Sequence, residues 1–251
     1  MSDEEGIGLL FGGQEEEEEE EEEEPEIWHD EYTRTGSSKH APELIKLKLA
    51  LVKKHHSLWG EYVYNAARVV SDYIDNGTIP VLNKTVLELG AGAGLPALMA
   101  ALNQASGVVI TDYGRCNDRS LILAIDLNIQ MLKSHISQKC TMKGAPYVWG
   151  QPIDGLQLEP TQLFDVVLLA DCIFNRSEHR NLLKTIKMCL AQQGTAYCSF
   201  SHHDPHKKEL DLVFLKLAES EFDLKCTFLS QEQRVAYPFQ VHWFLANNYT
   251  L

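Results

Sequence analysis

The sequence predicts an α/β domain built on a mostly parallel sheet with helices on both faces. Short apolar runs alternate with segments of helical periodicity over most of the chain, which is the pattern of strand–helix–strand units. A glycine-rich turn, "ELGAGAG", directly follows the first of these runs. The length of 251 residues suits one such domain with an appendage.

The appendage is an acidic N-terminal tail. Residues 15–24 are ten consecutive glutamates, and charge repulsion together with the lack of apolar side chains predicts that residues 1–25 are disordered. Of the 36 acidic residues, 16 lie in residues 1–31, which leaves 20 against all 22 Lys and Arg residues. The net charge of −14 therefore belongs to the tail. The tail is either a solvated extension or a tether for a basic partner.

Ordered structure is expected to begin near Glu26, where "EIWHDEYTRTG" and "APELIKLKLALVKKHHS" bring back aromatic and apolar residues. Apolar residues at three- and four-residue steps then predict a helix over Ser57–Asp75. Residues 26–84 are thus expected to form an N-terminal segment and helices that pack on a core of residues 85–251.

Seven apolar runs in this core region are expected to be strands. The predicted strands are Val86–Leu89, Val108–Thr111, Tyr147–Trp149, Phe164–Ala170, Thr195–Phe200, Leu224–Leu229 and Val241–Leu245. Helices are predicted to begin near Pro96, Ser120, Glu178 and Lys207. Only "SQEQRVAYPFQ" joins the last two strands, which is too short for a helical crossover, so this pair should be antiparallel.

Several classes of protein are disfavoured by composition. No segment approaches the roughly 18 uninterrupted apolar residues that a membrane span needs, and the N-terminus lacks the basic start of a secretory signal. Six scattered cysteines without a C-x-x-C pair argue against a disulfide or metal framework. We therefore expect a cytoplasmic monomer with neither a membrane nor a nucleic acid as its direct partner.

The glycine loop departs from the dinucleotide-binding pattern. That pattern needs G-x-G-x-x-G, whereas here Gly90, Gly92 and Gly94 are followed by Leu95. The missing glycine is the one that allows close strand–helix packing in dinucleotide-binding folds. Ligands of an open α/β sheet bind beyond the carboxyl ends of the strands, where this loop is expected to lie.

Glu88, immediately before the loop, adds an electrostatic mismatch with a dinucleotide. A carboxylate there repels a pyrophosphate but suits a cofactor that carries an ammonium and a sulfonium, and S-adenosylmethionine is such a cofactor. Gly90 and Gly92 would let the backbone approach it closely. Asp112, at the end of the second strand, is placed to accept hydrogen bonds from its ribose hydroxyls. A purely structural turn is the alternative.

Five stretches carry a family resemblance. "LWG", "VLELGAGAGLPALMAA", "TDY", "VWG" and "LLADCIFNRSEHRNLL" occur in the order and spacing of the seven-β-strand protein lysine methyltransferases known as family 16. The resemblance covers about Leu58–Phe200 and, more loosely, the C-terminal strands. It implies a Rossmann-like seven-stranded sheet of order 3-2-1-4-5-7-6 with strand 7 antiparallel. "DCIFNRSEH" is most similar to the fungal members that methylate the N-terminal glycine and adjacent lysine of translation elongation factor 1-alpha, which implies that protein as the substrate.

The resemblance also implies a set of cofactor-binding residues. Carried over position by position, these are Trp59, Gly90, Ala91, Gly92, Asp112, Trp149 and Ala170. Trp149 matches a tryptophan next to the adenine, and Ala170 matches a position whose backbone contacts the cofactor. Core packing is the alternative for both tryptophans, and helix capping is the alternative for Asp112.

The methyl-transfer site is implied by a D-x-x-[YF] motif. Asp171 and Phe174 match this motif after the fourth strand of the core. Asp171 would hold the incoming amine by its N–H groups, and Phe174 would wall the site, with Tyr237 and Phe239 as further candidates. Capping of the next helix is the alternative for Asp171, and His179 is expected to be structural.

Two segments depart from the family pattern. The loop Gly114–Arg119 is longer than expected, which leaves its role open. The run "SHHDPH", His202–His206, resembles a metal cluster but has no partner ligand set elsewhere in the sequence. It is instead expected to be a connection near the substrate.

Three other functions stay open beside the methylation of elongation factor 1-alpha. The first is a lysine methyltransferase for a different protein, since the cofactor residues would be the same. The second is a small-molecule, nicotinamide-like N-methyltransferase, which would need an enclosed apolar pocket. The third is a non-enzymatic scaffold that binds a basic partner through its glutamate tail.

Overall fold

The computed structural model describes residues 25–36, 38, 40–41, 46–53, 61–114, 119–235 and 243–251. The predicted site residues Trp59, Tyr237 and Phe239 lie outside these ranges, as do the ten consecutive glutamates. Within the described segments, no helix has the length and apolarity to cross a membrane.

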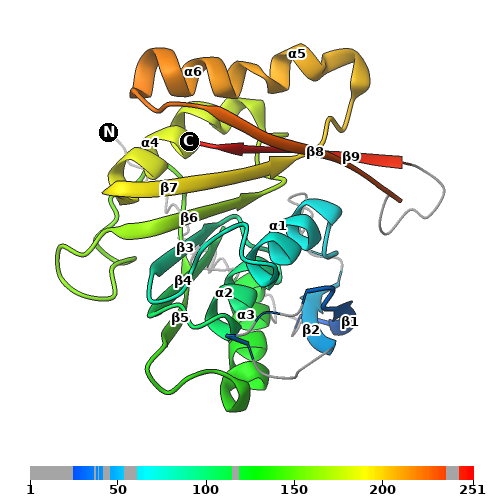
Figure 1. Ribbon diagram of the computed structural model, residues 1–251, viewed down its shortest axis with the longest axis vertical. Coiled ribbons are helices and arrows are strands. Elements are labelled where there is room, and N and C mark those ends of the chain that lie inside the picture. Colours follow the sequence, from blue (N-terminus) through cyan, green and yellow to red (C-terminus); the bar gives the residue numbers. More distant parts are fainter. Residues whose placement is uncertain are drawn as a thin grey trace, which may run out of the picture.

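A seven-stranded sheet forms the centre of the molecule (Figure 1). Its strands are β3 (Thr85–Leu89), β4 (Gly107–Asp112), β5 (Thr141–Pro146), β6 (Phe164–Ala170), β7 (Leu190–Phe200), β8 (Thr227–Val235) and β9 (Trp243–Thr250). The order across the sheet is β5-β4-β3-β6-β7-β9-β8. The strands β3 to β7 pair in parallel, whereas β9 pairs antiparallel with both β7 and β8.

The predicted fold class is confirmed by this topology. Counting only the strands of this sheet along the chain gives the order 3-2-1-4-5-7-6, with the last strand antiparallel. The chain runs from β3 outward to β4 and β5, and then returns to the other side of β3 with β6 and β7. The strand order therefore reverses at β3, and ligands of open α/β sheets bind beyond the carboxyl ends of the strands at such a point.

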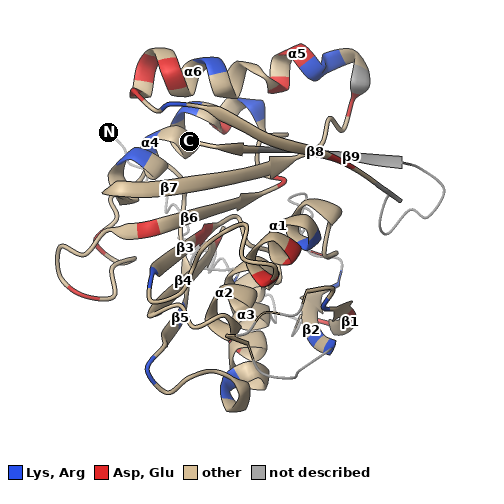
Figure 2. Ribbon diagram, in the orientation of Figure 1, with Lys and Arg blue, Asp and Glu red and all other residues tan. Residues whose placement is uncertain are grey.

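Helices cover both faces of the sheet (Figure 1). They are α1 (Asn65–Asp75), α2 (Leu95–Leu102), α3 (Ser120–Leu132), α4 (His179–Cys189), α5 (Lys208–Asp211) and α6 (Val213–Phe222). One apolar cluster joins α1, α2 and α3 to one face, and a second joins α4 and α6 to the other. Figure 2 shows basic residues on α4 and charges of both signs on α5 and α6, whereas the strands carry few.

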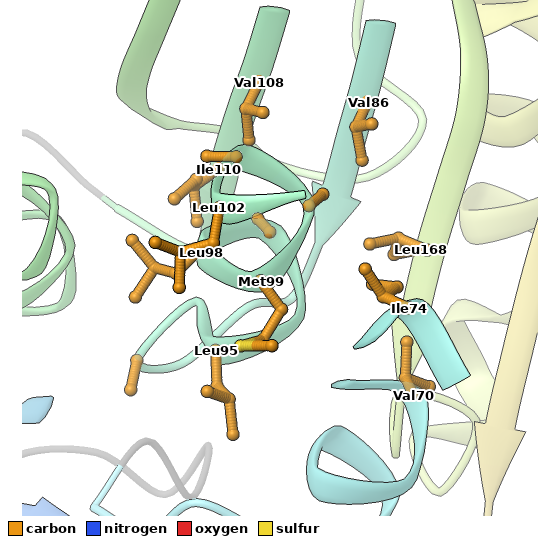
Figure 3. Close-up of a cluster of buried hydrophobic side chains, with 14 of the residues drawn as sticks. Val70, Ile74, Val86, Leu95, Leu98, Met99, Leu102, Val108, Ile110 and Leu168 are labelled. Carbon is orange, nitrogen blue, oxygen red and sulfur yellow. The ribbon is translucent and has the colours of Figure 1, made fainter. Parts of the chain in front are cut away.

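The helix α2 is apolar on every side because it is buried between the sheet and its neighbouring helices. In Figure 3, side chains of α1 and α2 face those of the strands; the labelled residues are Val70, Ile74, Leu95, Leu98, Met99, Leu102, Val86, Val108, Ile110 and Leu168. Burial of each such side chain contributes about 1.5–3 kcal/mol. This packing holds the first turn of α2, and with it the preceding glycine loop, in a fixed position.

A two-stranded hairpin, β1 (Ile27–Thr33) and β2 (Lys46–Val52), packs beside α1 and α3. Two buried carboxylates of α1 bind residues at the end of β1. Asp72 accepts hydrogen bonds from the Tyr32 hydroxyl at 2.5 Å and from Thr35 Oγ1 at 2.7 Å. Asp75 pairs with Arg34, and the two side chains are 0% and 6% exposed. The hairpin is thus an integral part of the domain.

The hairpin was not predicted, and two predicted elements are wrong in position. Tyr147–Trp149 lies after β5 and is apolar because it lines the site described below. The edge strand β5 itself is half exposed and therefore lacks an apolar run. The helix predicted from Ser57 begins at Asn65, because Tyr64 is extended with a ψ of 159°. The residues between 54 and 60 lie outside the described part.

Candidate active site at the carboxyl ends of the strands

A cavity of about 670 Å³ lies at the carboxyl ends of the parallel strands. The segments that follow β3, β4, β5, β6 and β7 all contribute to its wall, together with residues 62–64 before α1. Cavities of 300–1,000 Å³ are typical of small-molecule and cofactor sites. Among the described lining residues are three carboxylates, Asp112, Asp171 and Glu178, but no Lys or Arg.

The glycine loop forms one end of this cavity. Gly90, Gly92 and Gly94 have φ angles of +64°, +54° and +75°, a region that glycine adopts without strain. A Cβ at Gly90 would lie 3.0 Å from the Trp149 ring, whereas a Cβ at Gly92 would meet nothing within 4 Å. The backbone at Gly92 is therefore bare toward the cavity, as close approach of a ligand requires.

Asp112 joins the end of β4 to this loop. Its Oδ2 accepts a hydrogen bond from the Gly92 N–H at 2.5 Å, and its Oδ1 accepts one from the Tyr113 N–H at 2.6 Å. The structure thus brings Asp112 to the cavity wall beside Gly92.

Ala91, Trp149 and Ala170 also line the cavity. The Trp149 ring packs against Gly90, and Ala170 ends β6 next to β3. Trp149 is partly buried, packs against the apolar cluster on this side of the sheet and also lines the cavity.

Glu88 does not line the cavity, which corrects the role expected for it. Residues alternate along β3, so Glu88 faces α2 on the same side as Val86. It is 1% exposed, and its Oε2 accepts the Ala97 N–H at 2.9 Å in the first turn of α2. Burial raises the pKa of Glu88 to about 8, and the hydrogen bond from Ala97 only partly opposes this. A carboxyl that stays largely protonated at neutral pH does not select a cationic cofactor.

Asp171 and Phe174 form the other end of the cavity together with a histidine. Asp171 is buried and has a φ of +60°, and its N–H donates to the Ser199 carbonyl at 2.8 Å. Its Oδ2 lies 3.0 Å from Nε2 of His203. The rings of His203 and Phe174 are stacked, with centroids 5.4 Å apart. Asp171 thus faces the cavity and binds the loop after β7, and it does not cap the next helix.

Two tyrosines before α1 complete this end of the cavity. Tyr62 and Tyr64 both line it, and their rings meet edge to face at 6.1 Å. Burial and, secondly, the charge of Asp171 raise the pKa of Tyr64 well above its ordinary value. Tyr64 therefore stays a neutral phenol beside the carboxylate.

The other histidines and the thiols of this region are structural. His179 is 3% exposed, and its Nε2 lies 2.7 Å from the Ile173 carbonyl, consistent with the structural role expected for it. His202 Nδ1 lies 2.9 Å from Asp211. Cys172 donates from Sγ to the Leu89 carbonyl at 3.1 Å, and burial raises its pKa well above the usual value. In the part of the chain that the structure describes, no three His, Cys, Asp or Glu side chains are placed to share a metal ion.

The lining residues Tyr62, Tyr64 and Tyr147 were not predicted as site residues, and His203 was expected near the substrate only as part of the run His202–His206. Tyr62 and Tyr64 alternate in "EYVY", a period of two inside a segment taken for a helix, and that period was the available signal. His203 follows the fifth strand of the predicted sheet, so its place at the carboxyl edge was readable from the topology.

The sheet order, the antiparallel last strand and the glycine loop at the point of reversal together define the class I methyltransferase fold. Solved structures agree with this class. A protein described as a methyltransferase in complex with S-adenosylhomocysteine superimposes with a TM-score of 0.55 at 13% identity, over 82% of this chain and 54% of that one. The YcgJ protein of Bacillus subtilis superimposes with a TM-score of 0.51 at 12% identity, over 74% and 95% of the two chains.

The chain belongs to the lysine methyltransferase family, whose pattern matches residues 44–221, and it is an N-methyltransferase. It is 38% identical over 188 residues to the protein N-terminal and lysine N-methyltransferase efm7 of Schizosaccharomyces pombe, covering 72% of this chain and 70% of that protein. It is 34% identical over 223 residues to the protein of the same name in Candida glabrata, covering 86% and 84%. The relative of that name in Gibberella zeae is 36% identical over 193 residues, covering 72% and 70%.

Proposed function

We propose that this chain is an S-adenosylmethionine-dependent protein methyltransferase that methylates the N-terminal glycine and the adjacent lysine of translation elongation factor 1-alpha. The names of its relatives support protein N-terminal and lysine amines as the methylated groups. The resemblance of "DCIFNRSEH" supports the particular substrate. The proposal places the enzyme in the cytoplasm, where a translation factor is available to it, and takes it to act as a monomer.

The residues at the glycine end fit S-adenosylmethionine. The backbone at Gly92 is open to the cavity, and the Asp112 carboxylate beside it is a group that can accept hydrogen bonds from ribose hydroxyls. The Trp149 ring offers a flat apolar wall for an adenine. Three carboxylates without a Lys or Arg among the described lining residues favour a cationic ligand over one with phosphates. When bound, this cofactor supplies an electrophilic methyl group on a sulfonium.

The residues at the Asp171 end would receive the amine. The carboxylate of Asp171 would accept its N–H groups and hold its nitrogen along the axis of transfer, a positioning effect that is the main contribution of such a site. The ring faces of Phe174 and Tyr64 would favour the cationic methylated product. Trp59, in the family position beside the cofactor, remains a candidate outside the described residues.

The chemistry of the amine sets the demand on these residues. An amine attacks only when it is neutral, and the pKa is about 10.4 for lysine and about 8 for an α-amine. Deprotonation of the α-amine is therefore easier by roughly two units, or about 3 kcal/mol, before the site contributes. Burial in the cavity would lower either pKa further.

The observation that carries the proposal is that Asp171 and the glycine loop line the same cavity at the point of strand reversal. The test is incubation of the purified full-length chain with tritiated S-adenosylmethionine and purified elongation factor 1-alpha, followed by mass spectrometry of its peptides. The expected result is methylation of the N-terminal glycine and the next lysine. Label on an internal lysine of another protein in a lysate, with none on this factor, would overturn the substrate and favour a different lysine methyltransferase.

A further inference from the structure

Asp171 is bound to a histidine that the family motif does not include. Nε2 of His203 lies 3.0 Å from Asp171 Oδ2, and the side chains are 46% and 8% exposed. An ionised carboxylate only accepts hydrogen bonds, so the proton of this bond belongs to Nε2. In the neutral ring the other nitrogen, Nδ1, is then an acceptor. The pair therefore presents a basic nitrogen on a ring that lines the cavity.

The imidazole is held in place from several sides. Phe174 stacks on the His203 ring with an interplanar angle of 24°. The preceding residue, His202, binds Asp211 at 2.9 Å, and Asp211 in turn pairs with Arg176 at 2.7 Å. Two successive histidines after β7 are thus each bound to a carboxylate, one in the cavity and one in α5. This arrangement fixes the loop that carries His203.

We infer that His203 is the proton acceptor for the substrate amine and that Asp171 fixes its tautomer; the inference rests on the proposed function. The substrate ammonium gives one proton to Nδ1, and the electron pair of that N–H bond stays on the amine nitrogen. The imidazolium then releases the proton to water through the exposed part of the ring. The neutral nitrogen forms its bond to the methyl carbon as the sulfur keeps the electron pair of the broken C–S bond.

The charged groups that face His203 make it a suitable acceptor. The hydrogen bond to Asp171 raises the pKa of His203 above its ordinary value; burial opposes this, the charges of Asp171 and Asp211 add to it, and that of Arg176 opposes it. This upward shift brings the pKa of the imidazole closer to that of an α-amine, and proton transfer is most efficient between groups of similar pKa. Lysine, near 10.4, is a poorer match, so His203 favours the α-amine.

The other titratable groups of the cavity are less suitable. Tyr64 and Cys172 hold their protons, because burial raises the pKa of both. Asp112 is engaged by the glycine loop, and Glu178 accepts a hydrogen bond from Asn181 at 2.8 Å. His203 is the one imidazole among the described lining residues.

The test compares His203→Gln with the neighbouring variant His202→Gln in the full-length protein. Glutamine retains an N–H donor for Asp171 but cannot take up a proton. The substrate is a lysine-free peptide that begins Gly-Arg, so that the α-amine is its only methylatable amine, and kcat and KM are measured from pH 6 to pH 10. For His203→Gln we expect kcat at pH 7 to fall about 10²-fold, the lower end of what a general base supplies.

The shape of the pH profile separates a proton acceptor from a purely structural residue. In His203→Gln the rise of kcat with pH should shift to higher pH, and the curve should meet that of the wild type where the amine is already neutral. His202→Gln should keep the wild-type position of this rise. In a His203→Ala variant, added imidazole should restore part of the activity at pH 7.

Three results bear on the outcome. If kcat of His203→Gln rises at the same pH as kcat of the wild type, the inference is overturned, whether or not kcat is uniformly lower. If imidazole also fails to restore activity to His203→Ala, this second result would confirm that His203 is not the proton acceptor. If the wild-type protein binds no S-adenosylmethionine by calorimetry, or methylates neither this peptide nor elongation factor 1-alpha at any pH, the proposed function fails instead.

Discussion

The two ends of the cavity are built in different ways. The glycine end consists mainly of backbone from one strand–loop–helix–strand unit, in which Gly92 donates its N–H to Asp112 twenty positions later. The opposite end consists of side chains from three distant segments, represented by Tyr64, Asp171 and His203. The first end has a shape fixed by backbone conformation, and the second has a network of ionisable groups.

This difference separates binding from chemistry. Positive φ angles and backbone N–H groups bring a ligand close but cannot exchange protons, so changes at the glycine end should act on cofactor affinity. The pair of Asp171 and His203 can hold and move a proton, so changes there should act on turnover. Variants at one end of the cavity should therefore change cofactor affinity, and variants at the other end should change turnover.

Asp171→Asn should have the largest effect. Asparagine tolerates the left-handed conformation at a φ of +60°, so the fold should be retained, but the negative charge proposed to hold the amine is lost. We expect kcat to fall on the order of 10³-fold, the range that a general acid–base residue supplies. Calorimetry should show an S-adenosylmethionine Kd within about twofold of the wild type. An equal loss in Kd would place Asp171 in cofactor binding.

Asp112→Ala should do the reverse. The variant removes the acceptor of the Gly92 N–H and the expected partner of the ribose, so we expect the cofactor Kd to rise about 10²-fold, or about 2.7 kcal/mol. At saturating cofactor, kcat should stay within about twofold of the wild type. Asp112→Asn is the control, because its amide oxygen can still accept from Gly92. An unaltered Kd in Asp112→Ala would refute the ribose role.

The sequence predicted the glycine end of the cavity better than the opposite end. Gly90, Gly92 and Asp112 were identified because a strand, a glycine turn and a second strand that ends in an acid form one short pattern, and the structure places them together. Asp171 was identified through a family motif. His203 was not, because its partner lies 32 positions away and only the pairing of β6 with β7 brings the two together.

Two features of the structure, the hairpin β1–β2 and the burial of Glu88, differ from the prediction although the sequence contains the signal for both. The alternation in "KLKLALV" indicates a strand of period two, and the hairpin β1–β2 was missed because that segment was read only as a return of apolar residues. The side of Glu88 follows from the same alternation, since it lies two positions after Val86 and must share its face. The carboxylates that line the cavity and favour a cationic ligand are Asp112, Asp171 and Glu178.

The buried Glu88 should make the stability of the glycine end depend on pH. The pKa of this carboxyl is about 8 in the folded protein, against about 4.3 in an unfolded chain. Between these values the folded state keeps a proton that the unfolded state loses, so the free energy of unfolding falls as the pH rises and levels off above about 8. We expect a loss of about 2 kcal/mol between pH 6 and pH 8 from this group.

Urea denaturation of the wild type and of Glu88→Gln at both pH values checks this expectation. Glutamine is neutral throughout, so the pH-dependent loss attributable to this position should vanish in the variant. Glu221→Gln removes a surface carboxylate bound to Arg180 and serves as the control, with the wild-type dependence retained. The same slope in Glu88→Gln and the wild type would show that this carboxyl is already ionised at pH 6.

The smallest expected effect tests whether the open backbone at Gly92 is a ligand surface. Gly92→Ala and Gly77→Ala both place a Cβ on a left-handed residue, at φ angles of +54° and +83°, and in neither case does the Cβ meet an atom within 4 Å. Each should therefore lose about 1 kcal/mol of stability through backbone strain alone.

Gly77 lies in the exposed turn after α1, whereas Gly92 lines the cavity. Only Gly92→Ala should raise the cofactor Kd, by about tenfold, or about 1.4 kcal/mol. If the two variants bind the cofactor equally well, the ligand does not approach the chain at Gly92, and the division between a backbone-built binding end and a side-chain-built reactive end is wrong.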